Sequence, residues 1–192
     1  MIGILALQGN YQMHSQMLNK LDEKNIFIKD GSDLDGCDGL IIPGGESTVM
    51  SKMMRKYGLF DSIKKFGKEK SIFGTCAGLI LMSNYNSEGI MGLRLLNIDI
   101  SRNAWGTQIN SFTNKVNINI GDEIKNFKAT FIRAPKIKRV SKVNSSIKIL
   151  SYFKDAPIMI QEGLHMATTF HPEMHNDTLI HKYFLNIINE NK

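Results

Sequence analysis

Short apolar runs alternate with amphipathic stretches along the first half of the chain. The apolar runs predict four buried strands, at Ile2–Leu7, Ile26–Ile28, Gly39–Ile42 and Ser71–Gly74. Apolar residues at helical spacing predict helices between and after these strands, at Met13–Leu21, Ser47–Tyr57, Leu59–Phe66 and Ala77–Ser83. Because strands alternate with helices, we expect βαβ units and a mostly parallel sheet with helices on both faces.

The pattern becomes β-rich between Leu95 and Thr169. Short strands are predicted at Asn97–Ser101, Gln108–Phe112, Val116–Ile120, Ala129–Ile132, Ile147–Ser151, Ile158–Gln161 and Met166–Phe170. Some of them should form antiparallel hairpins, and others should return to the main sheet. The chain closes with a predicted helix whose apolar stripe is formed by Leu179, Ile180, Tyr183, Phe184, Ile187 and Ile188.

Composition fits one compact domain over residues 1–192. The chain is 42% hydrophobic and 22% charged, which excludes a disordered chain. Its net charge of +6 comes from scattered basic residues, and the one tight cluster is Lys136, Lys138, Arg139 and Lys142. No aromatic or Gly-rich readout motif accompanies this charge, so nucleic-acid binding is not expected.

The two cysteines, Cys37 and Cys76, stand in unrelated surroundings and do not suggest a disulfide framework. The first apolar run is too short for a signal-peptide core, and no stretch approaches the length of a membrane span. We therefore expect a cytoplasmic protein without a membrane partner.

Gly74-Thr75-Cys76-Ala77-Gly78 carries the strongest chemical signal. It lies between a predicted strand and a predicted helix, which is the setting of a nucleophile elbow with cysteine in place of serine. The glycines allow the tight turn, and the helix N-terminus favours a thiolate. The Ala77 N–H would be available to an oxyanion. We expect Cys76 to be a nucleophile and Cys37, in a polar turn, to be inert.

A thiol nucleophile needs a base, and His171 is the best placed of the five histidines. It follows a predicted strand at the sheet edge where open α/β folds keep their active sites, and it begins His171-Pro172-Glu173. Glu173 can turn back to fix the imidazole tautomer. His14 and His181 lie on predicted helices, where we expect them at the surface.

A third motif, Pro43-Gly44-Gly45-Glu46-Ser47-Thr48, lies between a predicted strand and a predicted helix. Paired glycines let the backbone approach a ligand and offer N–H groups to it. Glu46 and Ser47 can cap the helix or bind a ligand. The Gly-Lys-Ser/Thr ending of a Walker phosphate loop is missing.

Together these motifs resemble the class I (triad) glutamine amidotransferases. The finer pattern is similar to the glutaminase subunits of two-component pyridoxal 5′-phosphate synthases, over nearly the whole chain. It adds Leu5-Ala6-Leu7-Gln8-Gly9 followed by His14, Arg102-Asn103-Ala104-Trp105-Gly106-Thr107-Gln108 and Phe131-Ile132-Arg133-Ala134-Pro135. The resemblance implies a three-layer, flavodoxin-like α/β fold with a small antiparallel extension.

The resemblance also implies a role for each matching residue. Cys76 would be the nucleophile, His171 the base and Glu173 its orienting acid. Backbone N–H groups of Gly45 and Ala77 would form the oxyanion hole. The residues that bind glutamine would be Gly45, Glu46, Ser47, Arg102, Ile132 and Arg133. Guanidinium groups suit the α-carboxylate of that substrate.

The implied reaction is hydrolysis of L-glutamine to L-glutamate and ammonia through a cysteine thioester. The partner would be a (β/α)₈-barrel synthase that forms a ring decorated by glutaminase subunits. Docking would complete the oxyanion hole, with Gln8 and Gly9 near the contact. We expect no cofactor and no metal ion. Thr107 stands where a basic residue is common, Trp105 where Phe or Tyr is usual, and Met166–Thr169 where Gly or Ser is more often found.

Three alternatives remain at the level of the sequence. One is the glutaminase subunit of another amidotransferase, in histidine, purine or anthranilate synthesis; Gly45-Glu46-Ser47-Thr48 and Phe131-Ile132-Arg133-Ala134-Pro135 argue against it. Another is a stand-alone γ-glutamyl or cysteine hydrolase, which would be fully active without a partner. The third is a non-catalytic binding module, which would be expected to have lost Cys76, His171 or Glu173.

Overall fold

A mixed sheet forms the centre of the computed structural model, which describes residues 1–87, 89–102, 111–140 and 147–191. Its parallel strands are β1 (Ile2–Leu5), β2 (Asn25–Ile28), β3 (Gly39–Ile42), β4 (Ser71–Thr75) and β13 (His165–Thr168). The antiparallel β12 (Ala156–Glu162) and β11 (Lys148–Phe153) extend it. The order is β2-β1-β3-β4-β13-β12-β11, and the parallel part has the flavodoxin-like order.

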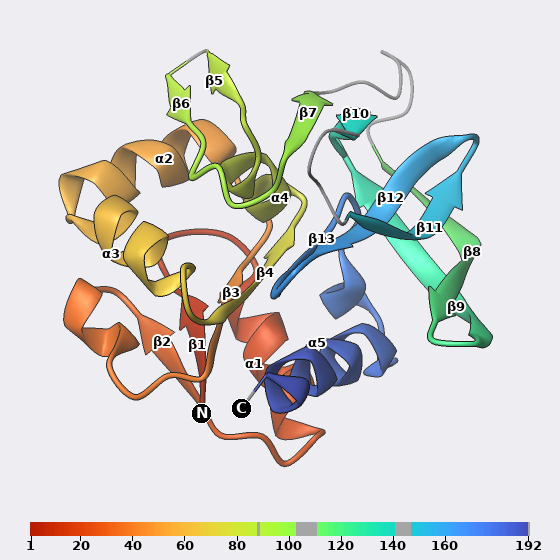
Figure 1. Ribbon diagram of the computed structural model, residues 1–192, viewed down its shortest axis with the longest axis horizontal. Coiled ribbons are helices and arrows are strands. Elements are labelled where there is room, and N and C mark those ends of the chain that lie inside the picture. Colours follow the sequence, from red (N-terminus) through yellow and green to blue (C-terminus); the bar gives the residue numbers. More distant parts are fainter. Residues whose placement is uncertain (88, 103–110, 141–146, 192) are drawn as a thin grey trace.

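Helices cover both faces of this sheet (Figure 1). One layer contains α2 (Ser47–Lys56), α3 (Leu59–Phe66) and α4 (Ala77–Met82), and the other contains α1 (Tyr11–Asn19) and α5 (Leu179–Glu190). Successive residues of β3 alternate between the layers: Leu40 and Ile42 pack in the first core, and Ile41 packs in the second. The expected three-layer α/β fold is confirmed. Two 3₁₀ turns, η1 (Gly31–Leu34) and η2 (Pro172–Met174), complete the helical segments.

Antiparallel pairs form the extension predicted for the middle of the chain. β8 (Ser111–Ile120) and β9 (Glu123–Ile132) make a long hairpin that packs on the α5 side. β7 (Ile98–Ser101) pairs with β10 (Lys136–Val140), and β5 (Asn86–Ser87) pairs with β6 (Ile90–Met91). The separate strands expected at 108–112 and 116–120 are wrong in part, because residues 111–120 form one continuous strand. Residues 108–110 lie outside the described residues.

The other strand predictions agree with the structure to within two residues, except that β9 begins at Glu123, six residues before the predicted strand at Ala129–Ile132. The first strand ends at Leu5 and not at Leu7, and the last ends at Thr168 and not at Phe170. The basic cluster, for which we predicted no element, forms β10; Lys138 and Arg139 are exposed on it, and Lys142 lies outside the described residues. β5 and β6 were also not predicted.

In the part of the chain that the structure describes, no helix is both long enough and apolar enough to cross a bilayer.

Candidate active site

Cys76 lies in the tight turn between β4 and α4. Its backbone adopts φ 48° and ψ −100°, a strained conformation for a residue other than glycine. A Cβ on Gly78 would come within 2.0 Å of the Ile42 carbonyl oxygen, and a Cβ on Gly74 within 2.7 Å of the Gly78 backbone. Both glycines are therefore required by close backbone packing, and the predicted elbow is confirmed as a strand–turn–helix.

Cys76 is 7% exposed and lines a pocket of about 410 Å³. Its thiol donates to the Ile132 carbonyl oxygen, with 3.7 Å between sulfur and oxygen. The predicted glutamine-binding residues and both predicted oxyanion donors line this same pocket: Gly45, Glu46, Ser47, Ala77, Arg102, Ile132 and Arg133. Residues from four separate segments of the chain thus meet at the thiol.

His171 follows β13 and forms one wall of the pocket. Its Nδ1 lies 2.7 Å from Oε1 of Glu173, which is 2% exposed at the start of η2. Burial opposes the charged imidazolium, but hydrogen bonds and charge from Cys76 and Glu173 raise the pKa of His171 to about 10. The imidazole is therefore poised to hold a proton beside the sulfur.

Glu173 is held as a carboxylate. Burial raises its pKa, but the nearby His14 imidazole and the hydrogen bond from His171 outweigh burial and lower the pKa to about 2. Asn10, just before α1, donates from Nδ2 to the same Oε1 at 3.2 Å. Glu173 thus contacts His171 from a position behind the pocket, which it does not line.

The Gly44–Gly45 turn packs directly on the His171 imidazole. A Cβ on Gly44 would come within 2.3 Å of His171 Cε1, so only glycine fits there. The Gly44 carbonyl accepts the Asn10 N–H at 3.2 Å. Because N–H and C=O of a trans peptide point in opposite directions, this bond turns the Gly45 N–H away from Asn10.

Glu46 is the N-cap of α2. Its carboxylate accepts from the backbone N–H groups of Thr48 and Val49 at 3.0 and 2.8 Å, and its own N–H donates to Gln8 Oε1 at 2.7 Å. Burial opposes ionisation, but the hydrogen bonds from the Thr48 and Val49 N–H groups lower the pKa of Glu46. The Arg102 guanidinium lies 3.8 Å from Glu46 Oε1. Arg133, with φ 42°, is exposed at the pocket rim.

The expectation that His14 and His181 lie at the surface is wrong, because both side chains are fully buried. The helical spacing of His14 indicates its burial, because it lies three and four residues before the buried Met17 and Leu18 and so on the same face of α1. His181 stands three residues before the buried Phe184. The contact of Asn10 with Glu173 was also not predicted. Trp105 and Thr107 lie outside the described residues.

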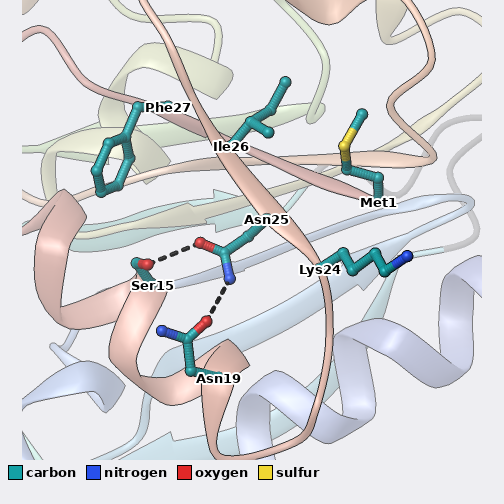
Figure 2. A pocket seen from close by; sticks show the side chains of 7 residues that line it. All are labelled: Met1, Ser15, Asn19, Lys24, Asn25, Ile26 and Phe27. Carbon is teal, nitrogen blue, oxygen red and sulfur yellow. Dashed lines mark hydrogen bonds between the residues drawn. The ribbon is translucent and has the colours of Figure 1, made fainter.

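A second pocket, of about 490 Å³, opens beside β2 and holds no comparable chemistry. Figure 2 shows that Asn25 bridges Ser15 and Asn19 there by hydrogen bonds. The remaining lining residues are Met1, Lys24, Ile26 and Phe27. Among the residues that the structure describes, no group of three or more His, Cys, Asp or Glu side chains is arranged to hold a metal ion.

Comparison with known proteins gives one consistent result. The model of the SNO glutamine amidotransferase family matches residues 4–190. A relative from Oenococcus oeni, named as the PdxT subunit of pyridoxal 5′-phosphate synthase, is 47% identical over all of this chain and 98% of its own. The subunit of the same name from Thermoplasma acidophilum is 43% identical over 97% of this chain and 92% of its own.

Solved structures agree with this result. A glutamine amidotransferase crystal structure superposes with a TM-score of 0.89 at 33% identity, over 98% of both chains. The PurLQS structure from Thermotoga maritima matches with a TM-score of 0.70 at 15% identity, over 100% of this chain and 98% of its own, and so shares the fold. On the strength of the matched family model and of relatives that cover the full chain, this protein belongs to the SNO glutamine amidotransferase family.

Proposed function

We propose that this chain is a glutaminase subunit that hydrolyses L-glutamine to L-glutamate and ammonia, and that it supplies the ammonia to a pyridoxal 5′-phosphate synthase subunit. The observation that carries the proposal is the meeting of Cys76 and His171 in one pocket, with Glu173 bonded to His171 behind it. Relatives that cover the full chain bear the corresponding subunit name.

The reaction begins at the Cys76 sulfur. The thiolate attacks the carboxamide carbon of glutamine, and the oxyanion that forms is stabilised by the backbone N–H groups of Ala77 and Gly45. His171 then gives its proton to the departing nitrogen, which leaves as ammonia, while the γ-glutamyl group remains on sulfur as a thioester. Water, deprotonated by His171, attacks the thioester, releases glutamate and returns the proton to the site.

Substrate binding uses the residues around the thiol. Arg102 and Arg133 face the α-carboxylate, because a guanidinium fork matches a carboxylate. Glu46 faces the α-ammonium group, and Ser47, Gly45 and the Ile132 backbone complete the contacts. All of these residues line the pocket. The whole chain, residues 1–192, acts as one glutaminase domain in the cytoplasm, where its two free cysteines stay reduced.

The synthase partner completes the oxyanion hole by setting the Gly44–Gly45 peptide. Two contacts hold that turn to the segment before α1: Asn10 N–H to Gly44 O, and Glu46 N–H to Gln8 Oε1. A partner that docks near Gln8 and Gly9 would therefore act on the turn directly. In the assembly, a ring of (β/α)₈-barrel synthase subunits carries the glutaminase subunits at its rim, and ammonia passes to the synthase without release to solvent.

The test compares glutamate release from glutamine by this chain alone and after addition of a purified pyridoxal 5′-phosphate synthase subunit. We expect weak turnover alone and a marked rise in the mixture, with co-elution of the two proteins at micromolar concentrations. Equal turnover without co-elution would support a stand-alone γ-glutamyl or cysteine hydrolase. Stimulation only by the synthase of a different pathway would support another amidotransferase.

A further inference from the structure

Two buried histidines from different helices meet behind the triad. His14 of α1 and His181 of α5 are both fully buried, and His14 Nδ1 lies 2.9 Å from His181 Nε2. The other nitrogen of His14, Nε2, lies 3.3 Å from the hydroxyl of Thr75, the residue before the nucleophile. The reaction as described above gives neither histidine a role.

His14 also faces Glu173. One carboxylate oxygen, Oε1, accepts from His171 at 2.7 Å and from Asn10 at 3.2 Å. The other oxygen, Oε2, is buried without a hydrogen bond, and His14 Nε2 lies 3.5 Å from it. A buried carboxylate oxygen without a donor is unfavourable, so the group that faces it matters for the whole triad.

The position of the hydrogen on His14 follows from its neighbours. If Nε2 carries the hydrogen, it points at the carboxylate and the Thr75 hydroxyl, and Nδ1 accepts from His181 Nε2–H. If Nδ1 carries it, a bare Nε2 lone pair faces an anionic oxygen. That second arrangement also leaves His181 Nδ1–H as a buried donor, although this nitrogen has no hydrogen-bond partner. Electrostatics therefore favours the first arrangement.

We propose that His14 is a positioning residue for the glutaminase reaction: its Nε2–H holds the second oxygen of Glu173 and keeps that carboxylate aligned on His171, while His181 fixes the His14 tautomer. The chain of contacts runs from α5 through α1 to η2 and then to the base. It ties the acid of the triad to Thr75, and so to the strand that carries Cys76.

The ionisation of the groups agrees with this role. Burial lowers the pKa of His14 and lowers that of His181 to about 3, so both imidazoles are neutral near pH 7. Among the described residues, the titratable groups coupled to Glu173 are His14 from α1, His171 before η2 and His181 from α5. A neutral imidazole that donates from Nε2 stabilises the Glu173 anion without adding a second charge to the buried site.

The first test reads the tautomer of the unmodified protein and does not depend on its activity. A long-range ¹⁵N–¹H NMR correlation spectrum of the protein with ¹⁵N-labelled histidine distinguishes ring nitrogens that carry a hydrogen from those that do not. Spectra of the His14→Gln and His181→Gln variants assign the signals. We expect His14 Nε2 to carry a hydrogen at pH 7. A bare Nε2 on His14 would overturn the proposal whether or not the protein is a glutaminase.

The second test, which rests on the proposed function, measures glutamine turnover in the complex with the synthase. His14→Leu removes the donor, whereas His14→Gln keeps an N–H near the same place. We expect His14→Leu to lower kcat about tenfold or more with KM within about twofold, because a misaligned His171 slows proton transfer while the groups that contact glutamine are unchanged. The acid limb of its pH profile should move to higher pH, because an unstabilised buried Glu173 takes up a proton more readily.

Control variants separate this positioning role from simple packing. His14→Gln should restore most of the turnover and the acid limb. His165→Asn alters another buried histidine, whose Nδ1 accepts from the Ile72 N–H, and should leave the acid limb in place. The proposal would be overturned if folded His14→Leu kept the wild-type kcat and acid limb. It would also be overturned if the His14→Gln variant did not recover turnover. Inactive wild-type complex would instead count against the proposed function.

Discussion

Nδ1 of His171 lies 2.7 Å from Oε1 of Glu173, two residues further along the chain. Pro172 between them begins a 3₁₀ turn, which brings the carboxylate back to the imidazole. Both side chains are buried, so this hydrogen bond acts in a medium of low polarity and its effect on protonation is large. The first prediction follows from that effect.

The free energy of unfolding should fall as the pH rises above about 6.5, because His171 loses its proton. Burial opposes its charged form, but Cys76 and Glu173 raise the pKa to about 10 in the folded chain, against 6.5 as the ordinary value. The folded state therefore binds the proton more tightly. The resulting stabilisation is complete below about pH 6.5 and is lost as the pH rises towards 10.

Urea unfolding of wild type and His171→Asn between pH 6.5 and 10 measures this contribution. Asparagine keeps an N–H near Nδ1 but does not titrate in this range. We expect the free energy of unfolding of wild type to fall by on the order of a few kcal/mol more than that of the variant. If the free energy of unfolding changed equally with pH in wild type and His171→Asn, the His171 proton would not be linked to folding.

Gly78→Ala should damage the nucleophile elbow. The added Cβ would come within 2.0 Å of the Ile42 carbonyl oxygen, and neither backbone segment can yield without moving β3 or α4. Overpacking of this kind costs about 1–3 kcal/mol, so we expect a lower Tm together with loss of most glutaminase activity.

Gly121→Ala is the matched control for that change. Gly121 lies in the β8–β9 turn with φ +60°, and a Cβ there meets no atom within 4 Å. We expect a penalty of about 1 kcal/mol from the backbone alone and unchanged turnover. Equal losses of activity in the two variants would contradict the structural role given to Gly78.

Arg102 and Arg133 should determine glutamine affinity more than chemistry. Replacement of either by Met removes a guanidinium from the pocket rim, and we expect KM for glutamine to rise about tenfold or more with a smaller change in kcat. Arg139→Met, on the exposed side of β10, is the control. Steady-state kinetics in the complex provide the measurement, and unchanged KM in both pocket variants would remove these residues from the binding site.

Strong local signals explain why much of the fold was predictable from the sequence. The strands β1, β3 and β4 are buried along their whole length; β1 and β3 are continuous apolar runs, and β4 has Ile72 and Phe73 at its centre. The β8–β9 hairpin was harder to predict, since Thr113, Asn114 and Lys115 interrupt its apolar pattern on an outward-facing stretch. β10 was missed for a similar reason: exposed Lys138 and Arg139 dominate it, and its pairing with β7 is a long-range contact.

The site was predictable where a motif carries its own geometry. The Gly44–Gly45 turn, Cys76 and His171 follow the carboxyl ends of β3, β4 and β13, which are neighbours in the sheet. Their convergence therefore follows from the topology. His14 and His181 were misjudged because histidine is read as a polar surface residue when its partners are unknown. Their burial depends on each other, as their 2.9 Å contact joins residues 167 positions apart.

Glutamine turnover by the Cys76→Ala and Cys37→Ala variants in complex with the synthase shows which cysteine carries out the reaction. Both cysteines are buried and free, but Cys76 alone lies in the pocket with His171. We expect Cys76→Ala to abolish glutamate release and Cys37→Ala to leave it near the wild-type rate. Full glutaminase activity in folded Cys76→Ala would show that Cys76 is not the nucleophile.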